Sequence, residues 1–384
     1  MTDSVVVLGG GYAGTAALTR FQDHAIDDCS VTWIDDTAYH LVRHEVHRVV
    51  RDPTVRPHIT VPLADVADGD TSVVRGTVEA VHPTERRVQL EEGDSIPFDY
   101  LVVAIGSEPA FYGIEGLRSN AYPLSTLQDA VGIHDAVADA AAKATPSSPA
   151  QIVVGGGGLS GIQTAGEIAA YRDEHDAPIA ITLVEALRRI LPEGDDDLRA
   201  AIETTLRNAG VDVRTNTPIV EATPDRVFFD DREPIPTDVL VWTGGISGRA
   251  TMGASGLETD SNRLRTGSDF QTSDERIFAV GDSALVETGG GTVPPTAQAA
   301  IQSGKAVADN VVRKRDGRPL ERWRYRDRGT LVSVGDTALA ADVIGLPAGV
   351  VDGHIATVMK KGVATRWLAS ITSWERALRA WPAL

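Results

Sequence analysis

The sequence predicts an α/β protein with two Rossmann-like domains, followed by a C-terminal segment with an amphipathic helix. Two similar stretches support this fold class: VVVLGGGYAG at 5–14 and IVVGGGGLSG at 152–161. In each of them an aliphatic, β-branched run leads into a glycine cluster. A strand, a glycine turn and a helix in this order open a dinucleotide-binding unit. The duplication therefore predicts two nucleotide sites in one chain.

Each glycine cluster contains the spacing G-x-G-x-x-G. The first glycine permits the turn, the second lets the backbone approach a pyrophosphate, and the third lets the helix pack on the strand. An ordinary strand-to-helix turn is the alternative, and the extra glycine in the second cluster leaves its register open. The two turns comprise Gly9, Gly11, Tyr12, Ala13 and Gly14, and then Gly156, Gly158, Leu159, Ser160 and Gly161.

An acidic residue follows each turn where the next strand should end. Asp35 lies 21 residues after Gly14, and Glu185 lies 24 residues after Gly161. Both spacings are near the value of about 20 expected for a carboxylate that accepts ribose hydroxyls. Two unrelated surface acids are the alternative. Glu185 also favours NADH over NADPH, because a carboxylate repels a 2′-phosphate, although two arginines follow it closely.

Composition excludes several classes of protein. No apolar run reaches 18 residues, and a first strand near residue 5 leaves no room for a signal peptide, so we expect a cytoplasmic protein. The net charge of −18, with only five lysines, disfavours a nucleic-acid partner and is typical of a protein from a high-salt cytoplasm. Cys29 is the single cysteine, so an internal dithiol is excluded. The histidines of HLVRHEVH (40–47) lack a convincing metal-ligand pattern, and we predict no metal site.

The remaining elements follow in order along the chain. Short strands are expected within 71–90, a buried strand in DYLVVAIGSEP, and a soft boundary at TPSSPA (145–150). An acidic first turn opens a helix that ends before Gly210, and IPTDVLVWTGG is another buried strand. IFAVGD (277–282) ends a strand, and a helix follows PPT at 294–296. From about 319 we expect irregular β structure and then the amphipathic helix.

These motifs in this order resemble the two-dinucleotide flavoprotein reductases, and within them the type II NADH dehydrogenases, which are single-subunit NADH:quinone oxidoreductases. The resemblance covers nearly the whole chain, and AQAAIQSG is its most specific part. It is carried by YHLV (39–42), AIG (104–106), GGGLSGIQTAGE (156–167), IFAVGD (277–282) and AQAAIQSG (297–304).

The resemblance implies FAD at the first turn and NADH at the second. It places Asp282 at the ribityl or phosphate region of FAD, and Gln298 and Gln302 beside the isoalloxazine and the quinone head. Gln163 stands where the family usually has a glutamate, which puts the protonation of reduced quinone in doubt, whereas Glu167 is retained. The remaining cofactor-site residues implied are Val78, Ala104, Gly106 and Ala297 for FAD, and Gly244 for NADH.

The residues themselves support part of this assignment. Asp282 ends a buried strand ahead of a helix, where its carboxylate can meet a sugar or diphosphate; a helix N-cap is the alternative. Gln298 and Gln302 are four residues apart and share a helix face, which a solvated polar face would also explain. The implied domains are 1–108 with 243–318 for FAD, 109–242 for NADH, and 319–384 for membrane association or dimerisation.

The function expected is hydride transfer from NADH to flavin, followed by two-electron reduction of a membrane quinone without proton pumping. One alternative is an NADH-dependent reductase of a small electron-carrier protein, which the acidic surface disfavours. A sulfide:quinone reductase would need cysteines that the chain lacks. A non-enzymatic flavin-binding sensor is the other alternative, and Gln163 is its best support.

The C-terminal segment is expected to attach the protein to the cytoplasmic face of the membrane. Trp367, Trp374 and Trp381 recur every seven residues, with Ile371 and Leu378 on the same stripe of a single helix over 363–384. Tryptophan favours the membrane interface, and residues 360–384 carry five basic side chains and one acid. The alternative is a helix that packs its tryptophans on the protein itself or on a partner in a homodimer.

Overall fold

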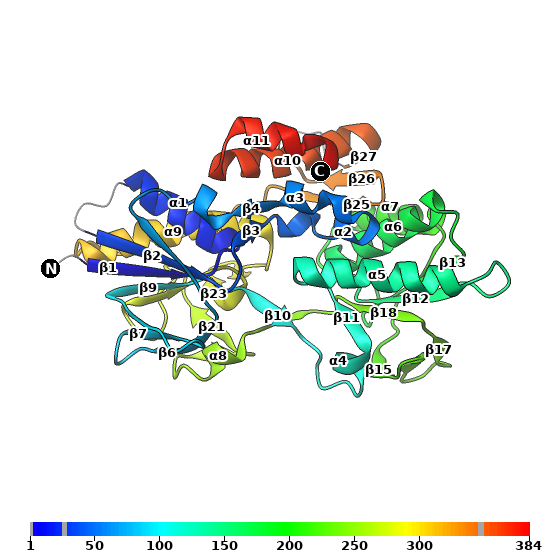
Figure 1. Ribbon diagram of the computed structural model, residues 1–384, viewed down its shortest axis with the longest axis horizontal. Helices are drawn as coiled ribbons and strands as arrows, with labels where there is room; N and C mark the ends of the chain where they lie inside the picture. The colour runs from blue at the N-terminus through cyan, green and yellow to red at the C-terminus, as the bar shows by residue number, and fades with distance from the viewer. Residues whose placement is uncertain (1–2, 25–28, 345–348) are drawn as a thin grey trace.

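The computed structural model describes residues 3–24, 29–344 and 349–384. Two five-stranded parallel sheets form its two halves, at the left and right of Figure 1, and the C-terminal helices lie above them. Each sheet begins with the aliphatic run that precedes a glycine turn, and the last four residues of both runs are buried. The predicted α/β class with two Rossmann-like units is confirmed.

The first sheet has the order β22-β9-β1-β2-β5, and all its neighbouring strands are parallel. Its outermost strand, β22, follows the whole second half in sequence, so the chain leaves the first half and later returns to it. The elements of this half are β1 (Asp3–Leu8), α1 (Tyr12–His24), β2 (Cys29–Asp35), β5 (Thr71–Arg75), β9 (Tyr100–Val103), β22 (Ile277–Ala279) and α9 (Ala297–Arg315).

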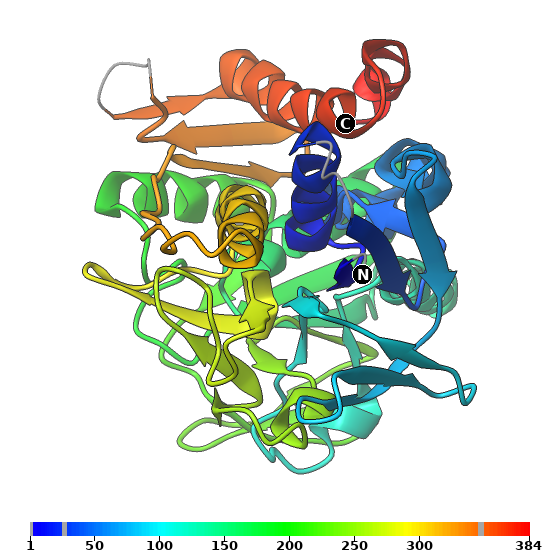
Figure 2. The same cartoon turned by 90° about the vertical axis from the view of Figure 1, so that its left-hand side faces the viewer.

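Helix α9 packs directly on α1, as the yellow and blue helices in Figure 2 show. A Cβ atom at Gly304 would lie 2.3 Å from the carbonyl oxygen of Ala13, so this close contact requires glycine. The predicted AQAAIQSG helix is therefore present, and its last glycine has a packing role. Its N-cap is Thr296, whose side chain accepts the N–H of Ala299.

The second sheet has the order β11-β18-β12-β13-β14 and is also parallel throughout. Helix α7 begins after Asp195, whose carboxylate accepts two backbone N–H groups, and Gly210 follows it at a φ of +70°, as predicted. The elements are β11 (Ala121–Pro123), α5 (Leu127–Lys143), β12 (Ala150–Gly155), α6 (Leu159–Glu174), β13 (Ile179–Val184), α7 (Asp196–Asn208), β14 (Val211–Arg214) and β18 (Val239–Trp242).

Smaller sheets and short helices complete the two halves. The antiparallel pair β10 and β19 joins segments that connect the halves. The strands are β3 (Tyr39–Leu41), β4 (Thr60–Pro62), β6 (Val78–His82), β7 (Arg87–Leu90), β8 (Ser95–Pro97), β10 (Ser107–Pro109), β15 (Ile219–Ala222), β16 (Arg226–Phe229), β17 (Ile235–Pro236), β19 (Ile246–Gly248), β20 (Thr259–Asp260), β21 (Arg263–Thr266), β23 (Ala284–Thr288) and β24 (Gly291–Thr292). The helices are η1 (Arg43–Glu45), α2 (Arg48–Arg51), η2 (Pro53–Val55), α3 (Arg56–Ile59), η3 (Leu63–Asp65), α4 (Leu117–Asn120), α8 (Ala250–Gly253) and η4 (Gly281–Ser283).

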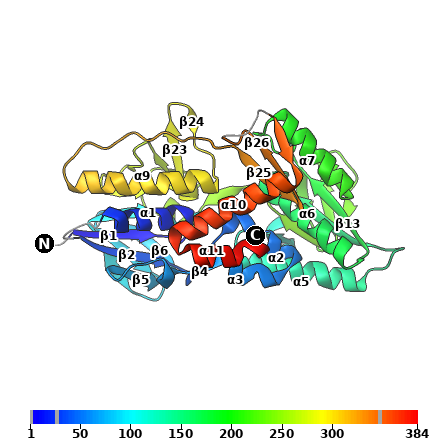
Figure 3. The ribbon, with the colours of Figure 1, turned by 90° about the horizontal axis from the view of Figure 1, so that it is seen from above.

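The C-terminal region is a small antiparallel sheet followed by helices. Seen from above, α10 runs across the junction between the two halves (Figure 3). No helix in the described part of the chain is long and apolar enough to cross a membrane. The elements are β25 (Thr330–Val334), β26 (Thr337–Ala341), β27 (Val350–Asp352), α10 (Gly353–Ile371), α11 (Trp374–Ala380) and η5 (Trp381–Ala383).

The prediction of one continuous helix over 363–384 is wrong. Helix α10 ends at Ile371, and Ser373 caps a separate helix, α11, by accepting the N–H of Arg376. The break divides the expected stripe, because Trp367 and Ile371 are buried whereas Trp374 and Leu378 are exposed.

Arg376 belongs to the separate helix α11. It donates to Asp65 at 2.6 Å and to the carbonyl oxygen of Thr60, so it holds α11 against the first half of the molecule.

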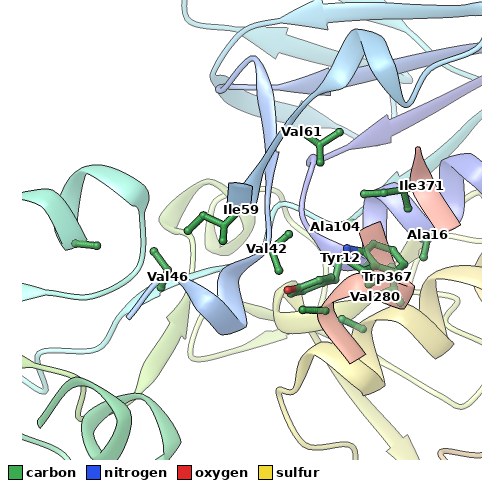
Figure 4. Packing of buried hydrophobic residues seen from close by; sticks show 14 of the residues in the cluster. Tyr12, Ala16, Val42, Val46, Ile59, Val61, Ala104, Val280, Trp367 and Ile371 are labelled. Carbon is green, nitrogen blue, oxygen red and sulfur yellow. The ribbon is translucent and has the colours of Figure 1, made fainter. Parts of the chain in front are cut away.

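Trp367 reaches into the main core between the two halves. In Figure 4 its ring lies beside Tyr12, and the ring centroids are 5.4 Å apart. Its indole N–H donates to Nε2 of His40 at 2.9 Å, which satisfies the polar atom of a ring that is otherwise buried. The C-terminal region is therefore joined to the first glycine turn by direct packing.

Candidate active site

The first glycine turn has the geometry of a nucleotide cradle. Gly9 has a φ of +105°, and a Cβ atom there would lie 2.2 Å from the carbonyl oxygen of Ala104. A Cβ atom at Gly14 would lie 1.9 Å from the carbonyl oxygen of Gly9. At Gly11, by contrast, no atom lies within 4 Å of the added carbon. Two glycines thus permit close packing, and the middle one leaves open space at the N-terminus of α1.

The second turn repeats this geometry. Gly156 has a φ of +107° and packs on Gly244, and a Cβ atom at Gly161 would lie 1.8 Å from the carbonyl oxygen of Gly156. Gly158 faces open space. The register is therefore Gly156, Gly158 and Gly161, and the extra glycine lies at 157. Leu159 and Ser160 begin α6 directly after the open position.

The predicted acidic residues lie against these turns. The carboxylate of Asp35 accepts the N–H of Gly10, together with the N–H and hydroxyl of Thr37. The carboxylate of Glu185 accepts the N–H of Gly157 at 2.6 Å and that of Leu187 at 2.7 Å. Each acid therefore ends its strand in direct contact with the glycine loop. Burial raises the pKa of Asp35 above its usual value.

The structure brings most of the other predicted FAD-site residues to the carboxyl ends of the strands of the first sheet. Ala104 follows β9 beside Gly9, and Gly106 has a φ of +72°. Asp282 belongs to η4, where its carboxylate lies 3.4 Å from the hydroxyl of Ser107. Because Thr296 is the N-cap of α9, Asp282 is not a cap of that helix. A small hollow between η4 and α9 is lined by Gly281, Asp282, Thr296, Ala299 and Ala300, among others.

Val78 and Ala297 are the first residues of two further elements, β6 and α9. Val78 begins β6, two residues after Gly76, whose N–H donates to the backbone carbonyl of Asp35. Ala297 is the first residue of α9. The open Gly11, the carboxylates of Asp35 and Asp282, and the N-termini of α1 and α9 fit a flavin dinucleotide. The second turn with Glu185 and Gly244 fits NADH in the same way.

Gln298 and Gln302 do share one face of α9. The amide of Gln298 donates to Asp327 and to the carbonyl oxygen of Gly329, and its oxygen accepts the N–H of Arg328. Gln302 bonds both backbone groups of Arg326, at 2.9 and 3.2 Å. Instead of a solvated polar face, the two side chains hold the extended 326–329 segment against the helix.

Gln163 and Glu167 lie on the buried side of α6. The oxygen of Gln163 accepts the hydroxyl of Ser333 at 3.4 Å. Glu167 is 1% exposed, and its Oε1 atom has no hydrogen-bond partner. Burial raises the pKa of Glu167 to about 7, although the charges of Arg48, Arg51 and Lys360 oppose the shift.

A buried ionic cluster surrounds Glu167, and no sequence pattern predicted it. Lys360 of α10 lies 2.9 Å from both carboxylate oxygens of Glu45, and Nε of Arg48 lies 2.6 Å from the same carboxylate. His47 lies between this pair and Glu167. Burial raises the pKa of Glu45, but the charges of Lys360, His44 and Arg48 outweigh it and the net shift is downward. The only signal in the sequence was the charged run HEVHR, whose lysine partner is 315 residues away.

The histidines of HLVRHEVH (40–47) belong to different elements of the structure. His40 lies in β3 and His44 in η1. Nδ1 of His40 contacts the carbonyl oxygen of Gly10, and Nδ1 of His44 contacts the hydroxyl of Tyr12. Burial lowers the pKa of each imidazole to about 4. Among the described residues no group of His, Cys, Asp or Glu could hold a metal ion.

Comparison with known proteins agrees with this geometry. Residues 3–304 match the family model described as pyridine nucleotide-disulphide oxidoreductase. The type II NADH:quinone oxidoreductase of Staphylococcus saprophyticus is 30% identical, over 94% of this chain and 94% of its own. The enzyme of the same name from Haemophilus influenzae is 30% identical, over 88% and 86%.

Among solved structures, the chain is similar to NDH2 of Plasmodium falciparum in complex with NADH. The TM-score is 0.85 at 14% identity, with 100% of this chain and 97% of the other covered. That likeness concerns the fold, whereas the similarity in sequence extends over nearly the full length of the bacterial relatives. The chain therefore belongs to the pyridine nucleotide-disulphide oxidoreductase family and, within it, to the type II NADH:quinone oxidoreductases.

Proposed function

We propose that the protein oxidises NADH and reduces a quinone, with FAD as its bound cofactor. The observation that carries this proposal is the pair of glycine turns with one geometry, each at the end of the central strand of its own parallel sheet. The relatives that match over 94% of the chain bear the name of this reaction. When bound, FAD accepts a hydride and releases two electrons, a chemistry that no amino-acid side chain supplies.

The residues of the chain bind and orient the two nucleotides. Gly11 and the N-terminus of α1 receive the FAD pyrophosphate, Asp35 its ribose, and Asp282 its ribityl or phosphate region. Gly158, Leu159, Ser160 and the N-terminus of α6 receive NADH. We assign 1–108 and 243–318 to the FAD domain, 109–242 to the NADH domain, and 319–384 to the C-terminal region.

Glu185 sets the preference for NADH. Its carboxylate is fixed by two backbone N–H groups at the end of β13, which leaves lone pairs for the ribose hydroxyls of NADH. The 2′-phosphate of NADPH would meet this fixed negative charge instead.

Gln298 and Gln302 belong to the acceptor side of the flavin. Their amides fix the 326–329 segment, so each glutamine positions both itself and the strand that leads into the C-terminal region. Gln163 and Glu167 stand on the other side of the junction, on α6. We place the quinone head beside Gln298 and Gln302, next to the flavin.

The quinone reaches the protein from a membrane on which the C-terminal helices lie. On α10 the apolar side chains of Ile355, Val358 and Val363 are exposed, and Ile355 and Val358 lie one helical turn apart. On α11 the exposed ones are Trp374 and Leu378, 63% and 59% accessible. Both helices lie on the near side of the molecule in Figure 3. An exposed apolar face with tryptophan at its end suits the interface of a lipid bilayer.

We assign the cytoplasmic leaflet of the cell membrane as the occupant of this face. A second copy of the chain would cover the same side chains, and light scattering separates the two cases. A stable dimer in the absence of lipid, with no flotation on anionic vesicles, would assign the face to the homodimer.

We also propose that the protein works at high salt. With a net charge of −18, the acidic side chains repel one another at low ionic strength, and added salt screens that repulsion. The source would then be a halophile, and the melting temperature should rise steadily with KCl concentration.

The experiment is to purify the protein, record its flavin spectrum and measure NADH oxidation with a soluble quinone. We expect a yellow protein that consumes NADH when the quinone is present. A colourless protein that takes up no FAD would refute the flavin site. A yellow protein that passes electrons only to a small carrier protein, or to no acceptor, would refute the quinone and favour the reductase or sensor alternatives.

A further inference from the structure

A line of titratable side chains runs through the junction between the two halves and the C-terminal region. One end is Glu167 on α6, and the other is Tyr12 at the first glycine turn. Between them lie His47, Lys360, Glu45 and His44, each from a short segment or helix at the junction. All six side chains except His44 are at least 90% buried.

The inner part of this line is closely spaced. Nζ of Lys360 lies 2.9 Å from each oxygen of Glu45 and 3.5 Å from Nε2 of His47. Oε1 of Glu45 lies 3.7 Å from Nε2 of His44. Nδ1 of His44 contacts the hydroxyl of Tyr12. The ammonium group therefore touches both neighbours, and the carboxylate lies between Lys360 and His44.

The outer part leads toward the solvent. Nε2 of His47 lies 3.9 Å from Oε1 of Glu167, and Oε2 of Glu167 lies 3.9 Å from Arg51. Arg51 is in turn held by Glu174 and by Asp336, whose side chain is 80% exposed. Since a guanidinium does not release its proton, Arg51 acts as a fixed charge, and water around these acids is the proton source.

Two side chains of the line each carry a buried atom without a partner. Oε1 of Glu167 and Nε2 of His44 have no hydrogen-bond partner, although both are shielded from solvent. Buried polar atoms are nearly always paired, so these two orphan atoms need an explanation. A proton that moves along the line supplies one.

The reaction itself requires such a proton. NADH, one proton and a quinone give NAD⁺ and a quinol: the hydride brings two electrons and one hydrogen, and the second hydrogen comes from water. We propose that Glu167, His47, Lys360, Glu45 and His44 conduct this proton from the surface at Arg51 to the first nucleotide site. This inference rests on the proposed function and names the proton route of the same site.

The chemistry of Glu167 and His47 suits this task. With a pKa of about 7, Glu167 takes up and releases a proton near neutral pH. Burial and the charge of Lys360 keep His47 neutral by lowering its pKa, so it can accept a proton from Glu167 and pass one on. The gaps of 3.5–3.9 Å exceed a hydrogen bond, and a side-chain rotation or a bridging water closes each of them.

Gln163 has no part in this route. It does not titrate, and it contacts the line only through Ser333, whose hydroxyl lies 3.4 Å from Gln163 and 3.3 Å from Nε2 of His47. The imidazole of His47 thus provides a proton carrier on the same side of the junction, where the glutamine provides none.

Other charged groups set the field along the line. They face it from α6, α2, the β25–β26 turn and α10: Glu174, Arg48, Arg51, Asp336 and Lys361. Both Arg48 and Lys361 are cations near Glu45, so removal of Lys360 alone leaves that carboxylate partly compensated.

The first test needs no turnover. Infrared spectroscopy follows the carbonyl stretch of protonated carboxyl groups in the flavin-loaded protein as the pH is raised. We expect a band that titrates near pH 7, is absent in Glu167→Gln, and moves in His47→Gln. A band that is present in Glu167→Gln, or unmoved in His47→Gln, would overturn the coupling between the two residues.

The second test measures the two half-reactions by stopped flow with a pH indicator. Glu167→Gln and His47→Gln should leave flavin reduction by NADH unchanged. They should slow quinone reduction and its proton uptake on the order of 10²-fold, with a larger solvent isotope effect. His134→Gln is the matched control, because His134 bonds the backbone of Val50 and lies outside the line.

The outcomes separate the two proposals. If the unchanged protein reduces no quinone, the proposed function fails, whereas the infrared result still tests the Glu167–His47 pair. If it reduces quinone and the variants keep the same rate, isotope effect and proton uptake, the proton route is wrong. Because Glu167→Gln is isosteric, it tests the route by itself even if His47→Gln does not fold.

Discussion

Substitution of the glycines in the second turn separates folding from nucleotide binding. A Cβ atom at Gly161 would lie 1.8 Å from the carbonyl oxygen of Gly156 and 2.7 Å from the hydroxyl oxygen of Thr243. Real Cβ contacts are essentially never below 3.0 Å, so the backbone would have to move by more than an ångström. At Gly158 the same atom would meet nothing within 4 Å. Two alanine substitutions in the same turn should therefore affect different properties. Gly161→Ala should lower the stability of the fold, and Gly158→Ala should weaken nucleotide binding.

The magnitudes follow from these contacts. Overpacking in a well-packed site costs about 1–3 kcal/mol, and Gly161→Ala belongs at the upper end because both clashing groups are held by the backbone of the turn. It should lower the melting temperature by several degrees. Gly158 has φ −77° and ψ −178°, which alanine adopts freely, so Gly158→Ala should keep its stability within about 1 kcal/mol. The methyl group then meets the pyrophosphate, and a cost of about 1–3 kcal/mol corresponds to roughly 5- to 150-fold weaker NADH binding.

The assay combines calorimetric titration of the oxidised, flavin-loaded protein with NAD⁺ and a melting curve read by flavin fluorescence. Gly11→Ala serves as the matched control in the first turn, where the added methyl group should reduce FAD loading. Unchanged NAD⁺ affinity in Gly158→Ala, together with an unchanged melting temperature in Gly161→Ala, would refute the assignment of this turn as a nucleotide cradle.

Three further changes test other parts of the molecule. Glu185→Ala should bring the kcat/KM values for NADH and NADPH closer together, and an unaltered ratio would remove its role in selectivity. Because the pKa of Glu167 is about 7 in the folded state against an ordinary value of 4.5, the native state should lose stability as the pH rises from about 4.5 to about 7. Glu167→Gln should remove that slope from the melting temperature, and a slope that persists would assign it elsewhere. Trp374→Ser with Leu378→Ser should abolish flotation with anionic liposomes while FAD content stays the same; flotation equal to that of the parent protein would place the membrane contact on another surface.

The two nucleotide turns could be predicted because their chemistry is local. An aliphatic run, three glycines at fixed spacing and an acid about 20 residues later define strand, turn and next strand without reference to distant residues. The same holds for the strand ends at Ala104 and Asp282, which follow apolar runs directly. Even the register left open by the extra glycine depended only on which glycine takes the positive φ.

The C-terminal helix was predicted less well. The seven-residue spacing of its tryptophans places them on one stripe only if the helix is continuous, and the spacing does not reveal where a helix ends. Trp367, Trp374 and Trp381 share a stripe only if the helix is continuous, and it ends at Ile371. Trp367 turns inward because His40 accepts its indole N–H in the core, whereas Trp374 remains exposed on α11. Contacts made by other parts of the chain decided which tryptophans face the outside.

The sequence by itself determined the α/β class, the two glycine cradles and the acid that belongs to each, because hydrophobic period, glycine spacing and strand ends act over a few residues. Only the tertiary structure decided that Lys360 pairs with Glu45 and that Glu167 loses a hydrogen-bond partner at the junction. Burial of a charge depends on three segments that fold against one another, and the two members of the ion pair are 315 residues apart in the chain. No local sequence pattern predicts this ion pair, because the free-energy cost of removing a charge from water depends on all the groups that surround it in the folded protein.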